Sequence, residues 1–282
     1  MKKTFLLLVC LIFSFGFAPK SLTWVAIGDS ITYLNDHPDE TGNRISKGYL
    51  TMVTDKFPNI KVANKGYNGW TGVKIATEFD KLSIPKADVY SIFLGTNDWW
   101  GGKSLGTMED YQNNTGTSTV YGAFRVIINN LRSLNDEAEI ILITPMQRVD
   151  FVYINDFKNN AYGSYREKNG QNLEQFANAI VAIAKADNFR VIDLYHKKGM
   201  EHASLVKFKR LKDPGTGEYK KFKYPDFIDV PFDPATDEYP YPEKSINVTY
   251  DGLHPSDKGY RLISKELFPI FKEINKETQA SQ

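Results

Sequence analysis

A serine that follows a short apolar segment is the first residue of this chain that could perform covalent chemistry. The segment Leu22–Gly28 is rich in residues that favour β-strands, and it ends on a glycine, which tolerates a tight turn. Ser30 comes two residues later, at the point where an open α/β sheet binds its ligands. A hydroxyl there can act as a nucleophile if a base and an oxyanion site are brought to it. Without them, Ser30 is a helix cap.

His254 is the residue that could serve as the base. An aspartate, Asp251, precedes it by three residues, and Gly252 eases the turn that would fold this carboxylate back onto the ring. Such an aspartate fixes the imidazole tautomer and stabilises the imidazolium ion. An ordinary turn before a helix explains the same residues, so the alternative stays open. We expect carboxylates to be placed less well around the remaining histidines, which are His37, His196 and His202.

Two residues could stabilise a developing oxyanion. Gly69 follows the second predicted strand and could offer a backbone N–H that no side chain blocks. Asn97 follows the third predicted strand and can donate from a neutral amide. Each is also a common turn residue. Their placement carries the argument, because Ser30, Gly69 and Asn97 follow three successive strands and therefore share one rim of the sheet.

Three tryptophans near these residues could contact a substrate. Trp70 comes directly after Gly69, whereas Trp99 and Trp100 come shortly after Asn97. Aromatic rings beside a reactive serine suit stacking on sugars or packing against acyl chains. Burial in the core is the alternative for all three, and it is favoured for Trp70.

The elements that must position these residues alternate between strands and helices. Helical stripes at 173–184 and 260–274 accompany the candidate strands, and Pro269 should kink or split the second helix. The strands are continuous apolar runs, which is typical of parallel strands covered on both faces. We therefore expect an α/β domain with helices on both faces of a mainly parallel five-stranded sheet. Its strands are predicted at 22–28, 60–64, 89–95, 140–144 and 190–194.

Two segments interrupt the alternation. Residues 99–120 are predicted to form a long loop, and residues 196–250 form an insertion with a hairpin of 206–212 and 218–224. Long ordered segments are often functional, so these two could set the substrate, or the insertion could merely cover an edge. The lysines of the hairpin could attract acidic polysaccharides. A guard against edge aggregation is the favoured explanation.

The composition and the N-terminus bound the setting. The 282 residues carry 35 Lys and Arg against 34 Asp and Glu, so the net charge of +1 predicts no nucleic-acid partner. Basic residues followed by the apolar run 5–17 predict a signal peptide over 1–18 and a secreted or periplasmic protein, with no stable membrane insertion after cleavage. Cys10 is the only cysteine, and Val9 before it disfavours a lipid anchor. The mature chain then has neither a disulfide nor a thiol nucleophile.

The four blocks around these residues resemble those of the SGNH/GDSL hydrolase family. They are Gly28–Ser30, Gly69, the run 95–98 and the run 251–254, in the family's order over nearly the whole mature chain. The resemblance implies a flavodoxin-like three-layer α/β/α sandwich and hydrolysis of esters or thioesters. It implies that Ser30 is the nucleophile, that His254 is the base oriented by Asp251, and that no metal or organic cofactor is needed. The oxyanion hole would be formed by the N–H groups of Ser30 and Gly69 and by the Asn97 side chain.

The expectation for function is an exported serine esterase in a single domain of residues 19–282. O-acetyl esters on carbohydrate are the first choice of substrate, so a small-molecule or glycan ester is the expected partner. A lipase-like or general short-chain esterase, or an acyltransferase, is the first alternative. A glycan-binding protein on the same fold, without catalysis, is the second. The α/β-hydrolase fold is disfavoured, because no serine lies in a Gly-x-Ser-x-Gly elbow.

Overall fold

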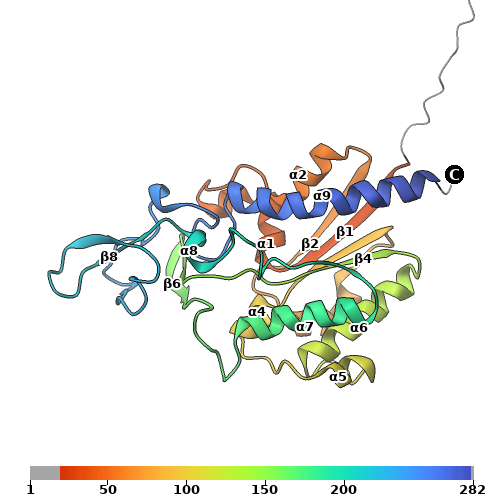
Figure 1. Ribbon diagram of the computed structural model, residues 1–282, viewed down its shortest axis with the longest axis horizontal. Coiled ribbons are helices and arrows are strands. Elements are labelled where there is room, and N and C mark those ends of the chain that lie inside the picture. The colour runs from red at the N-terminus through yellow and green to blue at the C-terminus, as the bar shows by residue number, and fades with distance from the viewer. Residues whose placement is uncertain (1–19, 281–282) are drawn as a thin grey trace, which may run out of the picture.

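The computed structural model describes residues 20–280, and its centre is a five-stranded parallel sheet (Figure 1). The strand order is β2-β1-β3-β4-β7. All four neighbouring pairs are parallel, which confirms the predicted sheet. Because strand ends fray into turns, the predicted bounds differ slightly from the observed ones. The strands are β1 (Leu22–Gly28), β2 (Ile60–Gly66), β3 (Val89–Phe93), β4 (Glu139–Ile143) and β7 (Arg190–Ile192).

Helices cover both faces of this sheet, so the chain forms the predicted α/β/α sandwich. Figure 1 shows α2 (Tyr49–Lys56) and α9 (Asp257–Ala280) on one face. The other face carries α3 (Gly72–Thr77), α6 (Val120–Leu134) and α7 (Leu173–Ala186). Strand β1 shows why its sequence is apolar throughout, since Trp24 and Ala26 join one core cluster whereas Val25 and Ile27 join the other. Side chains of a strand point alternately to opposite faces, so a strand covered on both needs both sets apolar.

Short elements connect these layers, and those that directly follow β1 and β3 build the rim at the carboxyl ends of the strands. The 3₁₀ helices are η1 (Leu34–Asp36), η2 (Pro38–Thr41), η3 (Phe79–Leu82) and η4 (Glu243–Ser245). The short α-helices are α1 (Ser30–Tyr33), α4 (Thr96–Trp100), α5 (Met108–Gln112) and α8 (His202–Leu205). Two antiparallel hairpins complete the set, β5 (Phe151–Tyr153) with β6 (Asp156–Ala161) and β8 (Lys209–Lys212) with β9 (Tyr219–Phe222).

Two expectations about helices were wrong. Residues 99–120 are not a plain loop, because they include the end of α4 and all of α5, whose capping box joins Thr107 to Asp110. Pro269 does not split the C-terminal helix, which is continuous from Asp257 to Ala280. Pro269 and Lys265, whose carbonyl it leaves without a helical donor, are both exposed to water. Buried apolar residues on both sides of Pro269 hold the helix against the sheet.

The predicted hairpin within residues 196–250 is confirmed as β8 and β9, and it extends beyond the end of the sheet (Figure 1). Four of its positively charged residues have acidic neighbours. Lys209 pairs with Asp150, Arg210 with Glu238, Lys212 with Asp237 and Lys220 with Asp213. This partial neutralisation weakens the case for a hairpin that attracts acidic polysaccharides.

The predicted signal segment 1–18, with Cys10, lies outside the described residues. Within residues 20–280, no helix combines the length and the apolar character needed to cross a bilayer.

Candidate active site

Ser30 lies at the start of α1, immediately after the central strand β1. Asp29 caps this helix, and its Oδ1 accepts a hydrogen bond from the Ile31 N–H at 2.9 Å. Gly28 has to be a glycine here, because a Cβ would lie 2.1 Å from the Thr32 Oγ1 as α1 packs over the end of the strand. The strand, the turn and the cap therefore fix the position of Ser30 before any other part of the site is considered.

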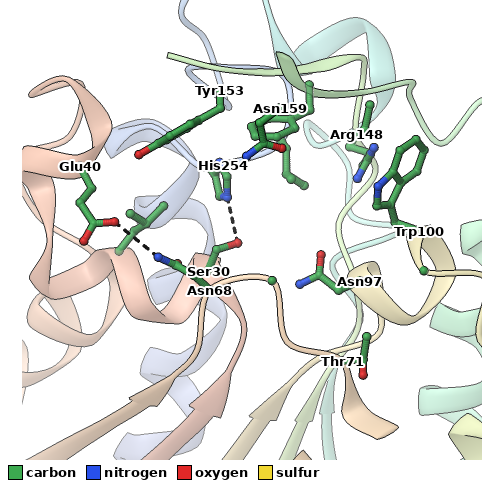
Figure 2. Close-up of a pocket in the computed structure, with 16 residues that line it drawn as sticks. Ser30, Glu40, Asn68, Thr71, Asn97, Trp100, Arg148, Tyr153, Asn159 and His254 are labelled. Atoms are coloured by element: carbon green, nitrogen blue, oxygen red, sulfur yellow. Dashed lines mark hydrogen bonds between the residues drawn. The ribbon is translucent and has the colours of Figure 1, made fainter. Parts of the chain in front are cut away.

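A chain of hydrogen bonds joins Ser30 to His254 and Asp251. The His254 Nε2 lies 2.9 Å from the Ser30 Oγ, as Figure 2 shows, and the His254 Nδ1 lies 2.7 Å from the Asp251 Oδ2. The carboxylate can only accept, so we assign the ring proton to Nδ1. Nε2 is then free to accept the serine proton. The structure thus brings Ser30 into contact with His254, which lies 224 residues later in the sequence and is paired with the nearby Asp251.

The turn that carries His254 is held rigidly. The Asp251 Oδ1 accepts the N–H groups of Leu253 at 3.0 Å and His254 at 2.7 Å, and Asp251 is fully buried. Gly252 has φ +93°, and a Cβ there would lie 2.1 Å from the Asp150 carbonyl oxygen. Since both the backbone conformation and the space demand glycine, Gly252 does more than ease a turn: it lets the Asp–His segment pack against the chain at residue 150.

Gly69 and Asn97 flank Ser30 on the same rim. All three residues line one cavity. Gly69 has φ +72°, and a Cβ there would meet nothing within 4 Å, so its backbone is open to a ligand. The Asn97 Nδ2 donates to the Trp70 carbonyl oxygen at 3.0 Å, which orients the amide and leaves its second N–H for another acceptor. These groups are suited to hold an oxyanion.

Asp98 is a site residue whose role the sequence reasoning missed. It is fully buried, and its carboxylate accepts the N–H groups of Gly72 at 2.8 Å and Val73 at 3.2 Å. Burial is the largest influence on Asp98 and raises its pKa, while these backbone hydrogen bonds act in the opposite direction. Asp98 therefore ties the helix of Asn97 to the segment that follows Gly69. The signal was its position next to Asn97, but sequence spacing alone cannot show which backbone it binds.

Two other histidines make similar contacts, but neither contacts both a carboxylate and a serine hydroxyl. Asp193 lies three residues before His196 and contacts its Nδ1 at 2.8 Å, so the expectation that no other histidine has such a partner was wrong. The His196 Nε2 faces Glu174 at 3.2 Å, not a hydroxyl. His202 contacts the Ser164 Oγ at 2.8 Å, and burial is the one cause that lowers the pKa of His202 to about 4. Neither His196 nor His202 lines the cavity of Ser30.

The tryptophan predictions require correction. Trp100 lines the cavity. Trp99 does not, because it is fully buried and donates from its ring N–H to the Gln171 carbonyl oxygen at 2.9 Å. Trp70 also does not line it, since its ring stacks on Tyr67 at 4.7 Å between centroids. Adjacent tryptophans on the short helix α4 point in different directions, and a sequence read as a loop could not reveal that.

The cavity beside Ser30 has a volume of about 430 Å³ and is walled in part by elements that the sequence did not identify. The β5–β6 hairpin supplies one wall (Figure 2), and no lining residue comes from 196–250, which goes against the alternative that this insertion contacts the substrate. That segment supports the hairpin from behind, through Lys209 on Asp150 and the Tyr239 hydroxyl on the Val152 carbonyl. The lining residues are Ser30, Leu34, Glu40, Asn68, Gly69, Thr71, Asn97, Trp100, Gly101, Arg148, Phe151, Tyr153, Asn159, Ala161, Leu253 and His254.

Comparison with known proteins identifies the family. A family model described as GDSL-like lipase/acylhydrolase matches residues 26–262. The chain belongs to this family. It is therefore an ester hydrolase of the GDSL type, as the four sequence blocks indicated.

Solved structures agree with this assignment of the family. A possible lipase from Chitinophaga pinensis is 58% identical, with a TM-score of 0.88 over 90% of this chain and 98% of that one. The acetyl xylan esterase AlAXEase is 18% identical, with a TM-score of 0.53 over 88% and 99%. A variant of an acetyl-xylooligosaccharide esterase from Geobacillus stearothermophilus is 19% identical, with a TM-score of 0.50 over 89% and 94%. The last two likenesses are of fold. No relative matched among curated proteins.

The aspartate of the GDSL block has an unusual ionisation. Asp29 is 2% exposed, and burial is the largest influence on its carboxyl, raising the pKa from 3.8 to about 6. The Ile31 N–H and the charge of His254 act in the opposite direction.

Within residues 20–280, no group of three or more His, Cys, Asp or Glu side chains is arranged to hold a metal ion.

The raised pKa of Asp29 predicts that the stability of the fold depends on pH. Between about pH 4 and pH 6, the folded chain keeps a proton on Asp29 that the unfolded chain releases, so stability falls as the pH rises through this window. Asp29→Asn keeps a side-chain oxygen for the Ile31 N–H but cannot ionise. We expect the unfolding free energy of this variant to change less between pH 4 and pH 7 than that of wild type. The difference between the two changes should be about 3 kcal/mol at most. Urea denaturation at four pH values measures this, and parallel pH profiles for both proteins would contradict it.

Proposed function

We propose that this GDSL-family chain is an exported serine esterase that cleaves carboxylic esters through an acyl-enzyme on Ser30. The observation that carries the proposal is the hydrogen-bonded chain from Asp251 through His254 to Ser30, which ends at an open cavity. A helix-capping serine does not need a buried histidine–carboxylate pair at its hydroxyl. The cap of α1 is in fact supplied by Asp29.

The geometry supports a two-stage reaction. His254 takes the proton of Ser30 at Nε2 while the serine Oγ attacks the ester carbonyl, and the buried Asp251 stabilises the imidazolium that forms. His254 then returns the proton to the leaving alcohol, and the acyl group stays on Ser30. Water, deprotonated by His254, attacks this acyl-enzyme, and the serine leaves with the same proton. The enzyme is restored when the carboxylic acid departs.

Hydrogen-bond donors stabilise the negative charge that develops on the carbonyl oxygen of the ester. We assign this role to the N–H groups of Ser30 and Gly69 and to the second N–H of Asn97, because all three residues line the cavity. A donor of this kind is worth about 10²–10³ in kcat, because it is already oriented when the charge appears. Asp98 contributes indirectly, since it fixes Gly72 and Val73 and so holds the Gly69 segment against the helix of Asn97.

The cavity favours a short acyl group on a polar alcohol. Besides the residues of the reaction, its wall presents Glu40, Asn68, Arg148 and Asn159, which a long acyl chain would have to desolvate at a cost. Its apolar surface comes largely from one cluster, in which Phe151, Ala161 and Leu253 pack with Trp100 and Tyr153. This cluster suits an acetyl methyl group or the face of a sugar ring. We therefore propose O-acetyl esters on carbohydrate as the substrate class. The fold shared with acetyl xylan esterases is compatible with this choice.

A lipase-like esterase is the second candidate, because the relative with 58% identity is described as a possible lipase. The two candidates differ in the acyl chain that they accept. Export in either case rests on the basic and apolar segment 1–18.

A panel of esters tests the proposed function. We expect kcat/KM for 4-nitrophenyl acetate to exceed that for 4-nitrophenyl decanoate at least about ten-fold, since one or two unpaired polar groups cost this much. We also expect acetate to be released from acetylated xylan. Faster cleavage of the decanoate ester, with no release of acetate, would support the lipase-like candidate. Failure to cleave any ester would contradict both and would favour a binding protein on this fold.

A further inference from the structure

Arg148 places a buried positive charge in the wall of the active-site cavity. Its side chain is 1% exposed, and it lines the cavity together with Ser30 and His254. Figure 2 shows Arg148 beside Trp100, across the cavity from His254. The proposed reaction uses Arg148 in no step, so its presence requires another explanation.

The contacts of Arg148 leave part of its guanidinium free. The Nε and Nη2 groups both donate to the Tyr162 carbonyl oxygen, at 3.3 and 2.8 Å. The guanidinium also lies over the ring of Trp100, at 4.8 Å from the centroid. Within residues 20–280, no carboxylate lies within 4.0 Å of it, and its Nη1 donates no hydrogen bond. The hydrogen bonding of this buried guanidinium is therefore incomplete, because the two N–H groups of Nη1 have no acceptor among the described residues.

Lys209 shows how this chain otherwise treats a buried cation. Lys209 is 2% exposed, and its Nζ contacts the Asp150 Oδ2 at 2.7 Å. Asp150 and Asp251 also attract Arg148 over a longer distance, but Asp150 is occupied by Lys209 and Asp251 by His254. Burial lowers the pKa of Arg148 to about 10, so it remains a cation at neutral pH. A buried ion without an adjacent counterion is costly, and an anion in the cavity would offset that cost.

We propose that Arg148 binds a carboxylate of the substrate, so that the preferred esters carry a negative charge close to the bond that is cleaved. This inference rests on the proposed esterase function and narrows its substrate class. A guanidinium donates two parallel hydrogen bonds to a carboxylate, and the free Nη1 is available for this contact. If the alcohol is a carbohydrate, it is a sugar acid.

Glu40 places a negative charge in the cavity wall, away from the positive charge of Arg148. Glu40 lines the wall away from Arg148 (Figure 2), and it is held there by the hydroxyl of Tyr33 at 2.7 Å and the amide of Asn68 at 3.4 Å. Glu40 repels a carboxylate from its side, whereas Arg148 attracts it. An anionic ester therefore enters the cavity in one orientation relative to Ser30.

Matched pairs of esters test the inference. The first pair is 4-carboxyphenyl acetate and 4-carbamoylphenyl acetate, which differ in charge on the alcohol side. The second pair is mono-4-nitrophenyl glutarate and 4-nitrophenyl pentanoate, which differ in charge on the acyl side. In at least one pair, we expect wild-type kcat/KM to favour the acid about ten-fold or more. Arg148→Gln should lower this acid-to-neutral ratio about 10–100-fold, Arg148→Lys should lower it less, and Arg166→Gln, which removes an exposed cation outside this cavity, should preserve it.

The results that overturn the inference are separate from those that overturn the proposed function. An equal loss on both members of each pair would assign Arg148 to support of the Tyr162 segment or to the oxyanion, and the inference would be wrong. A wild-type enzyme that cleaves the acid and the neutral ester equally in both pairs would also overturn the inference. Calorimetric binding of 4-hydroxybenzoate against 4-hydroxybenzamide requires neither turnover nor a folded variant. Where the first pair is the one that favours the acid, we expect wild type to bind the benzoate at least ten-fold more tightly, and equal or undetectable binding of both would then contradict the inference.

Discussion

Replacing Ser30 by alanine is expected to lower kcat/KM on 4-nitrophenyl acetate by about 10⁴-fold or more. The substitution removes the single oxygen that lies 2.9 Å from the His254 Nε2, so no acyl-enzyme can form. The donors beside it and the cavity remain, and they account for the residual rate over water. Ser30 contributes no cap to α1, since Asp29 does, and the fold should therefore survive the change. Steady-state kinetics with thermal unfolding of the same preparation measures both effects.

The chain supplies a matched control for this substitution. Ser164 also contacts a histidine, the Nε2 of His202 at 2.8 Å, but that histidine has no carboxylate partner among the described residues and lies outside the cavity. Ser164→Ala should keep kcat/KM within about ten-fold of wild type, the range set by its lost hydrogen bonds. Ester cleavage that survives Ser30→Ala but not Ser164→Ala would show that the nucleophile has been assigned to the wrong serine–histidine pair.

Asp251→Asn is expected to lower kcat by about 10⁴-fold while the fold is retained. The amide oxygen can still accept the N–H groups of Leu253 and His254, which keeps the turn intact. The amide NH₂ would then face the His254 Nδ1 as a donor, so the ring proton would move to Nε2. A protonated Nε2 cannot accept the Ser30 proton. The loss should appear in kcat at neutral pH, and circular dichroism should show an unchanged fold.

Asp193→Asn is the matched control for this second substitution. Asp193 stands three residues before His196 and contacts its Nδ1 at 2.8 Å, which reproduces the spacing and contact of Asp251 with His254. This pair is partly exposed and has no serine opposite, so its removal should leave kcat within about two-fold, as for other surface ion pairs. A comparable loss in both variants, or none in Asp251→Asn, would contradict the role assigned to Asp251.

The sheet and the residues on its rim could be predicted because each leaves a local signal. A strand covered on both faces is apolar at every position, and β1 shows this from Leu22 to Gly28 apart from Thr23. Ser30, Gly69 and Asn97 each follow a strand within a few residues, so their common rim follows from the parallel topology. The contact of His254 with Ser30 spans 224 residues, and the sequence pointed to it through a resemblance to a family.

The walls of the cavity could not be predicted, because their residues act through tertiary contacts. Arg148 has no periodic or motif signal, and its importance comes from burial without a counterion. The strands β5 and β6 are short, and most side chains of β6 are polar, so nothing in the sequence marks them as the cover of an active site. Trp99 and Trp100 are adjacent and chemically identical, yet one is in the core and the other in the cavity. Such choices depend on the direction of a side chain, which composition does not encode.

Covalent labelling of Ser30 tests the central claim most directly. A fluorophosphonate reacts with a serine that is activated by a neighbouring base and remains attached, so intact mass followed by peptide mapping locates it. We predict one adduct per chain on the peptide that contains Ser30, loss of ester cleavage in proportion to labelling, and no adduct in Ser30→Ala. An adduct on another residue, or full ester cleavage by a chain labelled at Ser30, would contradict the assignment of the nucleophile.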